Sequence, residues 1–143
     1  MRWRANRSAA ENARLVLPKL AQKYFDAGRK AASDEKPSAK DLHRFRIATK
    51  RFRYSLEIFR PVYGASLEAR IGTLRELQNV LGQLSDYHSM ERLFAGEKEL
   101  EARLESAAAK KFKEFRAAWA AFDSEGQLKR WKAYLAHAPS KRT

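Results

Sequence analysis

The apolar residues of this chain return every three or four positions over long segments, and no segment alternates with a period of two. A three-four spacing places apolar side chains on one face of an α-helix, whereas a half-buried β-strand requires strict alternation. The sequence therefore predicts an all-α protein.

Local start and stop signals divide this pattern into four long helices and a short fifth one. Ser8 with Glu11, and Ser38 with Asp41, place an acidic residue three positions after a serine, which is typical of a helix N-terminus. Pro61 is expected to end the second helix. The apolar residues that define these helices span residues 13–31, 42–59, 67–84, 100–122 and 128–135.

The third helix carries the weakest local signals. Ser66 is expected to cap it, and Gly72 and Gly82 within it indicate a kink or a close contact with another helix. The short connectors favour an antiparallel four-helix bundle with a short C-terminal fifth helix. We expect a single domain over residues 1–138, followed by a frayed tail at 139–143.

The charge of the chain restricts its partners. It has 30 Lys and Arg residues against 17 Asp and Glu residues, a formal net charge of +13. Such an excess favours anionic partners: nucleic acid, phosphate polymers or an acidic membrane surface. The chain has no cysteine, which excludes disulfides and thiolate metal sites. No apolar run approaches the roughly 18 residues of a membrane span, and the cytoplasm is the expected compartment.

The second helix gathers much of this charge into one stripe. His43, Arg46, Lys50 and Arg53 follow the spacing i, i+3, i+7, i+10 and share an arc of roughly 80° on the helical wheel. They form a ladder with one step every ~5 Å, from a rise of about 1.5 Å per residue. An arginine fork can hold two phosphate oxygens, so a linear polyanion could meet each step.

A second apolar strip borders this basic stripe. Ile47, Tyr54 and Ile58 lie on the side of the stripe away from the core-facing residues. Cations between apolar walls are partly desolvated and repel one another, which costs free energy unless an anion joins them. The arrangement thus favours a binding site, although a solvated basic flank, with His43 as a structural histidine, remains the alternative interpretation.

The chain offers no arrangement typical of an enzyme. Its three histidines have no regular spacing, and no Gly-rich phosphate loop is present. Asp86 and His88 are two positions apart and do not share a helix face, so they make a poor metal site. Asp86 is instead expected to pair with a nearby cation or backbone group. We therefore expect no catalytic residue, no metal and no cofactor.

Two segments resemble the motifs of the CHAD family, the conserved histidine α-helical domain. The first reads Leu42-His43-x-x-Arg46-x-x-x-Lys50-Arg51-x-Arg53-Tyr54-x-Leu56-x-x-Phe59. The second reads Leu77-Gln78-x-x-Leu81-Gly82-x-Leu84-x-Asp86. The resemblance implies an all-helical domain that binds inorganic polyphosphate through basic residues lining a cavity, often in association with polyphosphate granules.

The resemblance also assigns binding residues. The positions that match the basic signature of the family are His43, Arg46, Lys50, Arg51 and Arg53. To these we add three lysines from one flank of the first helix, which we expect to face the same cleft. They are Lys19, Lys23 and Lys30.

The chain departs from the family pattern in two respects. CHAD domains usually contain two related four-helix bundles, and this chain as a whole resembles roughly the N-terminal half of one. Ser85 stands before Asp86, where the family often carries arginine. The strip of Ile47, Tyr54 and Ile58 would then cover the fifth helix or pair with a second copy, and such a homodimer would rebuild the two-bundle arrangement.

Other functions fit the charge less well. A nucleic-acid-binding bundle would interleave base-reading polar residues with its arginines, whereas the signature helix interleaves apolar ones. A non-catalytic scaffold for a partner protein stays open, and the core spacing of the helices disfavours a binder of membrane surfaces. If His43 meets a polyanion as an imidazolium, affinity should rise as pH falls, with His88 and His137 as controls.

Overall fold

The computed structural model describes residues 3–137 as a set of helices, with no strand among them. The all-α prediction is therefore confirmed, while the tail predicted at 139–143 lies outside the described residues. The helices are α1 (Ala9–Ser33), α2 (Ala39–Ile58), α3 (Arg60–Tyr63), α4 (Ser66–Leu93), α5 (Lys98–Phe122) and α6 (Gln127–Ala136).

Two of the expected helix starts are confirmed in atomic detail. The Glu11 amide donates to the Ser8 hydroxyl at 3.1 Å, and the Ser8 amide donates to the Glu11 carboxylate at 2.9 Å. At α2 the Asp41 amide donates to the Ser38 hydroxyl at 3.0 Å. Each serine satisfies a backbone N–H that the first turn of its helix leaves unpaired.

The start of α4 differs from the prediction. Its N-cap is Ala65, and Ser66 is already the first helical residue, with its hydroxyl 2.6 Å from the Tyr134 hydroxyl on α6. The short helix α3 was also missed, because four residues are too few to show a periodicity. Pro61 fits at the start of α3, where its missing N–H leaves no hydrogen bond unmade.

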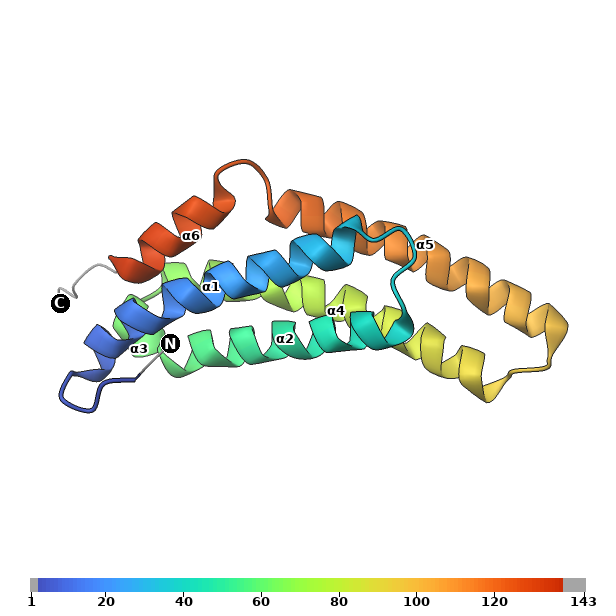
Figure 1. The fold of residues 1–143 in the computed structure, drawn as a ribbon, viewed down its shortest axis with the longest axis horizontal. Coiled ribbons are helices and arrows are strands. Elements are labelled where there is room, and N and C mark those ends of the chain that lie inside the picture. Colours follow the sequence, from blue (N-terminus) through green and yellow to red (C-terminus); the bar gives the residue numbers. More distant parts are fainter. Residues whose placement is uncertain (1–2, 138–143) are drawn as a thin grey trace.

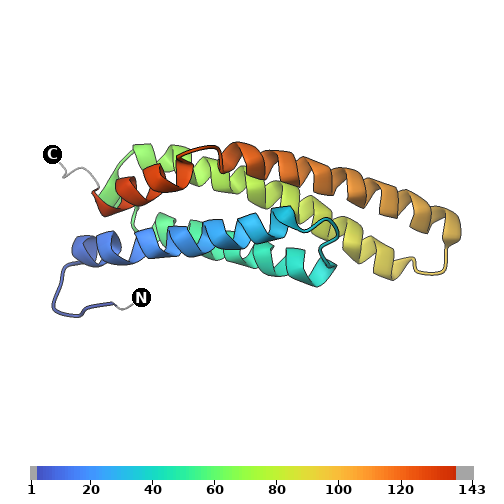
Figure 2. The same cartoon turned by 45° about the horizontal axis from the view of Figure 1, so that its top comes forward.

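The helices pack as neighbouring antiparallel segments (Figures 1 and 2). α2 packs between α1 and α4, α4 also packs along α5, and α6 returns along α1. The connected ends of α4 and α5 project beyond the ends of α1 and α2. α6 lies against α1, so the proposal that Ile47, Tyr54 and Ile58 of α2 cover the fifth helix is wrong.

Aromatic side chains fill the centre of the fold. The Tyr24 ring stacks between those of Phe45 and Phe52, at 5.1 and 5.0 Å between ring centroids. Its hydroxyl lies 2.8 Å from the Thr49 hydroxyl, which donates in turn to the Phe45 carbonyl. The buried polar atoms of this part of the core are thus satisfied, as burial requires.

Close helix contact occurs at a glycine, but on α1 and not on α4. At Gly28 the ring of Trp119 from α5 occupies the space that a Cβ atom would need. Gly72 has nothing within 4 Å of its Cβ position, and at Gly82 the nearest atom is the Arg46 Nε at 3.8 Å, an ordinary contact. The close contact predicted for α4 is therefore wrong.

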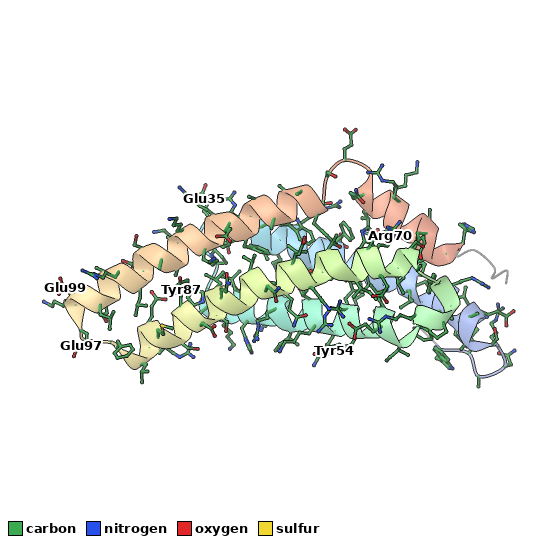
Figure 3. The ribbon with its side chains drawn as sticks, turned by 180° about the vertical axis from the view of Figure 1, so that it is seen from behind. Glu35, Tyr54, Arg70, Tyr87, Glu97 and Glu99 are labelled. Atoms are coloured by element: carbon green, nitrogen blue, oxygen red, sulfur yellow. The ribbon has the colours of Figure 1, made fainter. Side chains whose placement is uncertain are left out.

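α6 joins the core through both its apolar and its polar faces. Trp131 and Leu135 are buried in the main cluster. Arg70 of α4 lies beside α6, with its guanidinium 4.2 Å from the centre of the Tyr134 ring (Figure 3). The described helices include none with the length and apolar character of a membrane span.

Candidate functional site

The two neighbours of α2 divide its cations into two groups. α4 packs along one flank of α2 and α1 along the other. The Arg53 Nε donates to the Gln78 side chain of α4 at 2.9 Å, and the Arg46 Nε lies 3.8 Å from the Cβ position of Gly82. We call this line of contact the α2–α4 seam, defined by His43, Arg46, Lys50 and Arg53 on α2 and by Gln78, Gly82, Ser85, His88, Ser89 and Arg92 on α4.

The two motifs identified in the sequence therefore meet in space. Gln78 and Gly82 come from the second motif, and each faces a cation of the first. The leucines of the second motif are buried in the core. Asp86 is exposed, and within residues 3–137 its carboxylate makes no ion pair or side-chain hydrogen bond, so the expected structural pairing is wrong.

A carboxylate occupies one end of the seam. Glu57 accepts from Arg53 at 2.5 Å and from Arg75 of α4 at 3.3 Å, and Arg60 lies 4.0 Å away. The Arg53 guanidinium also lies 4.8 Å from the centre of the Tyr54 ring. Arg53 is therefore engaged on several sides, and it is not the free step of the ladder that its spacing predicted.

Arg46 and Lys50 have no such partner. Among residues 3–137, no carboxylate lies within 4.0 Å of either side chain. The Arg46 Nε is buried without a hydrogen bond, an arrangement that costs roughly 1–3 kcal/mol for a polar group. Lys50 follows one turn later and is partly buried. Two adjacent positive charges at this spacing repel each other.

Two of the other predicted cations, Arg51 and Lys23, belong to a separate groove between α1 and α2. Arg51 and Arg44 line it from α2 and Lys23 lines it from α1, around a volume of about 580 Å³. Lys30 lines a neighbouring depression together with Arg44, while Lys19 is exposed and lines neither. The prediction that the lysines of the first helix face the same cleft as the basic stripe is thus wrong.

An exposed apolar ridge separates the two groups of cations. Ile58 is 71% exposed and Tyr54 is 48% exposed, whereas Ile47 lies at the edge of the α1–α2 groove. The second apolar strip expected from the sequence therefore exists on α2, with no helix of the described chain covering Tyr54 and Ile58. This strip lies between the cations of α2 that face α4 and the cations of α2 that face α1.

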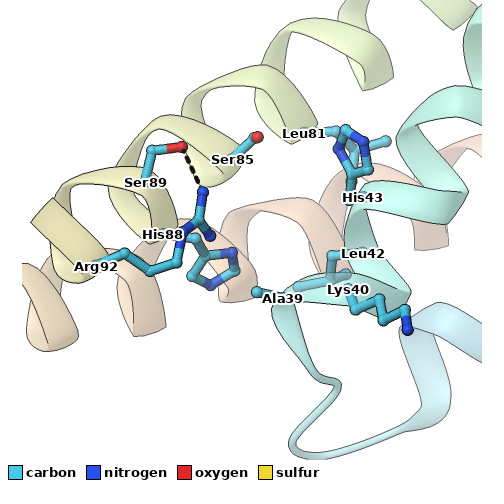
Figure 4. A pocket seen from close by; sticks show the side chains of 9 residues that line it. All are labelled: Ala39, Lys40, Leu42, His43, Leu81, Ser85, His88, Ser89 and Arg92. Carbon is cyan, nitrogen blue, oxygen red and sulfur yellow. Dashed lines mark hydrogen bonds between the residues drawn. The ribbon is translucent and has the colours of Figure 1, made fainter.

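The far end of the seam opens into a pocket of about 440 Å³ (Figure 4). His43 faces it from α2, and Ser85, His88, Ser89 and Arg92 line it from α4. Ala39, Lys40, Leu42 and Leu81 complete the lining. None of the α4 residues was predicted to bind, although their three-four spacing continues the flank of α4 that begins at Gln78 and Gly82.

The placement of His88 changes the role expected for it. His88 lines the same pocket as His43, so it is not an independent control for the titration of His43. Burial lowers the pKa of His88; Glu91 opposes this effect, and the charge of Arg92 adds to it. His137 is exposed after the end of α6 and remains a suitable control.

Metal ligands do not gather in the described part of the chain. Residues 3–137 contain no group of three or more histidine, cysteine, aspartate or glutamate side chains placed to hold a metal ion. Away from the Glu57 end, the charged side chains of the seam and its pocket are cations, and the two serine hydroxyls of the pocket can donate, which suits an anion with several acceptor oxygens.

Comparison with known proteins gives one family match. The sequence model described as CHAD domain matches residues 1–95 of the 143-residue chain. The matched stretch is shorter than the whole-chain resemblance expected from the motifs, and it ends just after α4, so that it contains both walls of the seam. No curated protein and no solved structure matches the chain.

Proposed function

Because the chain belongs to the CHAD domain family, we propose that it binds inorganic polyphosphate along the α2–α4 seam. The observation that carries the proposal is the pair of Arg46 and Lys50, which no carboxylate of the described chain neutralises. A bound anion would remove the repulsion between these two charges. The proposed role is binding, with no chemistry performed on the ligand.

The residues of the seam have different proposed roles in binding. The planar fork of Arg46 can hold two oxygens of one phosphate, and Lys50 supplies a compact charge to the next. His43 extends the site toward the pocket. Arg53, held by Gln78 and Glu57, limits the site at its other end. We assign Arg51 with Lys23 and Lys19 to an outer surface that attracts the polyanion without belonging to the seam.

The proposal extends to the fold and the setting. α1, α2, α4 and α5 would act as an antiparallel four-helix bundle that holds the seam rigid, with α6 as an addition on α1. Polyphosphate binding would recruit the protein to polyphosphate granules. A second copy covering Tyr54 and Ile58 remains a prediction, and sedimentation at several protein concentrations checks it.

Substituting Gly82 by glutamate tests the site directly. The new carboxylate would lie beside Arg46, because the Gly82 Cβ position is 3.8 Å from the Arg46 Nε. An ion pair there would compete with the ligand, and we expect the affinity for long-chain polyphosphate to fall at least about tenfold, given roughly 1.5–3 kcal/mol for a charge-assisted hydrogen bond. Isothermal titration calorimetry measures this change.

Gly72→Glu is the matched control. It introduces the same charge on the same helix, about 15 Å away for ten residues of helix, at a position with nothing within 4 Å. Both substitutions replace glycine by a better helix former, so neither should unfold the protein. Equal losses of affinity in the two variants would mean that only net charge matters and that the seam is not the site.

A further inference from the structure

The pocket at the end of the seam has the chemistry of an anion site. Figure 4 shows His43 on one side of it and His88 with Arg92 on the other. The hydroxyls of Ser85 and Ser89 add neutral donors, and Arg92 donates to Ser89 at 3.3 Å. The Lys40 amine points away from the imidazoles. All the charged or titratable groups that line this pocket are therefore cationic or neutral.

The charge around the pocket changes sign just beyond it. Residues 86–105, which form the projecting ends of α4 and α5, carry a formal net charge of −3, whereas the rest of the chain carries +16. Three carboxylates, Glu91, Glu101 and Glu105, line a depression on this projection together with one cation, Lys98. An anionic chain that continued past the pocket onto this projection would be repelled by its carboxylates, over a range of about one Debye length, 8–10 Å.

At the opposite end of the seam the guanidinium groups of Arg53 and Arg75 are already engaged by a carboxylate, that of Glu57. The seam therefore offers free positive charge only over a short stretch, from Lys50 to Arg92, and this stretch finishes in the pocket. A long polyphosphate chain can use the whole stretch only if it ends in the pocket or turns away from the protein.

We infer that the pocket receives the terminal phosphate of a polyphosphate chain whose internal units lie against Arg46 and Lys50. The inference rests on the proposed function and adds to it the place where the bound polyphosphate chain ends. A terminal phosphate has three non-bridging oxygens and a second negative charge near neutral pH, whereas an internal unit has two such oxygens and one charge. It can accept more hydrogen bonds, which is what donors on both walls of the pocket provide.

Two small phosphates test recognition of a chain end when they are compared in the wild-type protein and in a variant of the pocket, because the linear compound also carries more negative charge than the cyclic one. Linear tripolyphosphate has two ends, and cyclic trimetaphosphate has the same number of phosphorus atoms and no end. We expect the wild-type protein to bind the linear form at least about tenfold more tightly than the cyclic form. A tenfold ratio corresponds to about 1.4 kcal/mol of charge-assisted contacts that the cyclic form cannot make. Isothermal titration calorimetry of both compounds measures the ratio.

The double variant His88→Gln, Arg92→Gln removes the imidazole and the guanidinium that α4 contributes to the pocket and leaves His43, Arg46 and Lys50 in place. It should bind the two compounds within about threefold of each other while keeping most of its affinity for long-chain polyphosphate. His137→Gln with Lys129→Gln removes a histidine just after α6 and a positive charge on α6, both at exposed positions, and should keep the wild-type ratio.

The outcomes separate this inference from the function on which it rests. If long-chain polyphosphate binds but the double variant keeps the wild-type preference for the linear compound, the pocket does not receive the chain end and the inference is overturned. If the wild-type protein fails to bind long-chain polyphosphate at all, the proposed function itself falls. Circular dichroism and thermal melting of each variant show that its fold is intact.

Discussion

Replacing Arg46 and Lys50 together by glutamate should abolish polyphosphate binding and leave the protein folded. Each residue would lose a charge-assisted contact worth roughly 1.5–3 kcal/mol, and the new carboxylates would repel the ligand. We expect the affinity to fall by at least about 100-fold. Neither side chain makes an ion pair with the described residues, so no such contact is lost.

Two further variants make this result interpretable. Lys110→Glu with Lys113→Glu reverses the same amount of charge at exposed positions of α5 and should reduce affinity far less. The neutral pair Arg46→Gln with Lys50→Gln should weaken binding while helicity and melting temperature stay close to those of the wild type. If the neutral pair unfolds the protein, the two residues are structural and their assignment to the site is wrong.

Gly28→Ala should destabilise the protein although alanine is the better helix former. The ring of Trp119 fills the space beside Gly28, and Trp119 is 3% exposed among Phe25, Phe45 and Phe122. Overpacking a core by one methyl group typically costs about 1–3 kcal/mol, more than the roughly 1 kcal/mol gained in helix propensity. Urea denaturation should show a lower free energy of unfolding.

The same substitution at Gly72 should have the opposite effect. Its Cβ position has nothing within 4 Å, so only the helix propensity changes and the protein should gain up to about 1 kcal/mol. A comparison of the two variants therefore isolates the contact between α1 and α5 from the intrinsic preference for alanine. A gain in stability at both positions would show that Trp119 can move aside without cost.

The sequence predicted what short-range chemistry controls. Ser8 and Ser38 cap helices through atoms three residues away, and both caps were correct. Ser66 failed because its hydroxyl pairs with Tyr134, which lies 68 residues further along the chain. Ser66 also lacks the acidic residue that stands three positions after Ser8 and Ser38, since Ala69 occupies that place.

The binding residues show the same division. A helical wheel gives the angle of each side chain on α2, but it does not say which helix lies on each flank. The family resemblance placed Arg51 with Arg46, and the wheel of the first helix added Lys23, whereas α2 itself separates both from Arg46. Glu57 falls within the arc of the basic stripe. It pairs there with Arg75, which comes from α4 and which a wheel of α2 alone does not show.

The pocket at the end of the seam was not predicted, because its residues on α4 lie beyond the last apolar residue of the pattern. The apolar residues that predict the third helix end at Leu84, whereas α4 continues to Leu93. The pocket residues Ser85, His88 and Arg92 all belong to this additional length. No core leucine marks the end of α4, because its last turns project beyond α1 and α2 and bury less apolar surface.

The central claim is that the seam recognises polyphosphate and does not merely attract any polyanion. A competition titration of long-chain polyphosphate against DNA, RNA and heparin at matched charge tests it most directly. Polyphosphate should displace each competitor, and its affinity should fall with salt at a slope near −2, from about −0.7 for each of three seam cations. Equal affinity for all four polyanions, or a slope near zero for polyphosphate, would contradict this account.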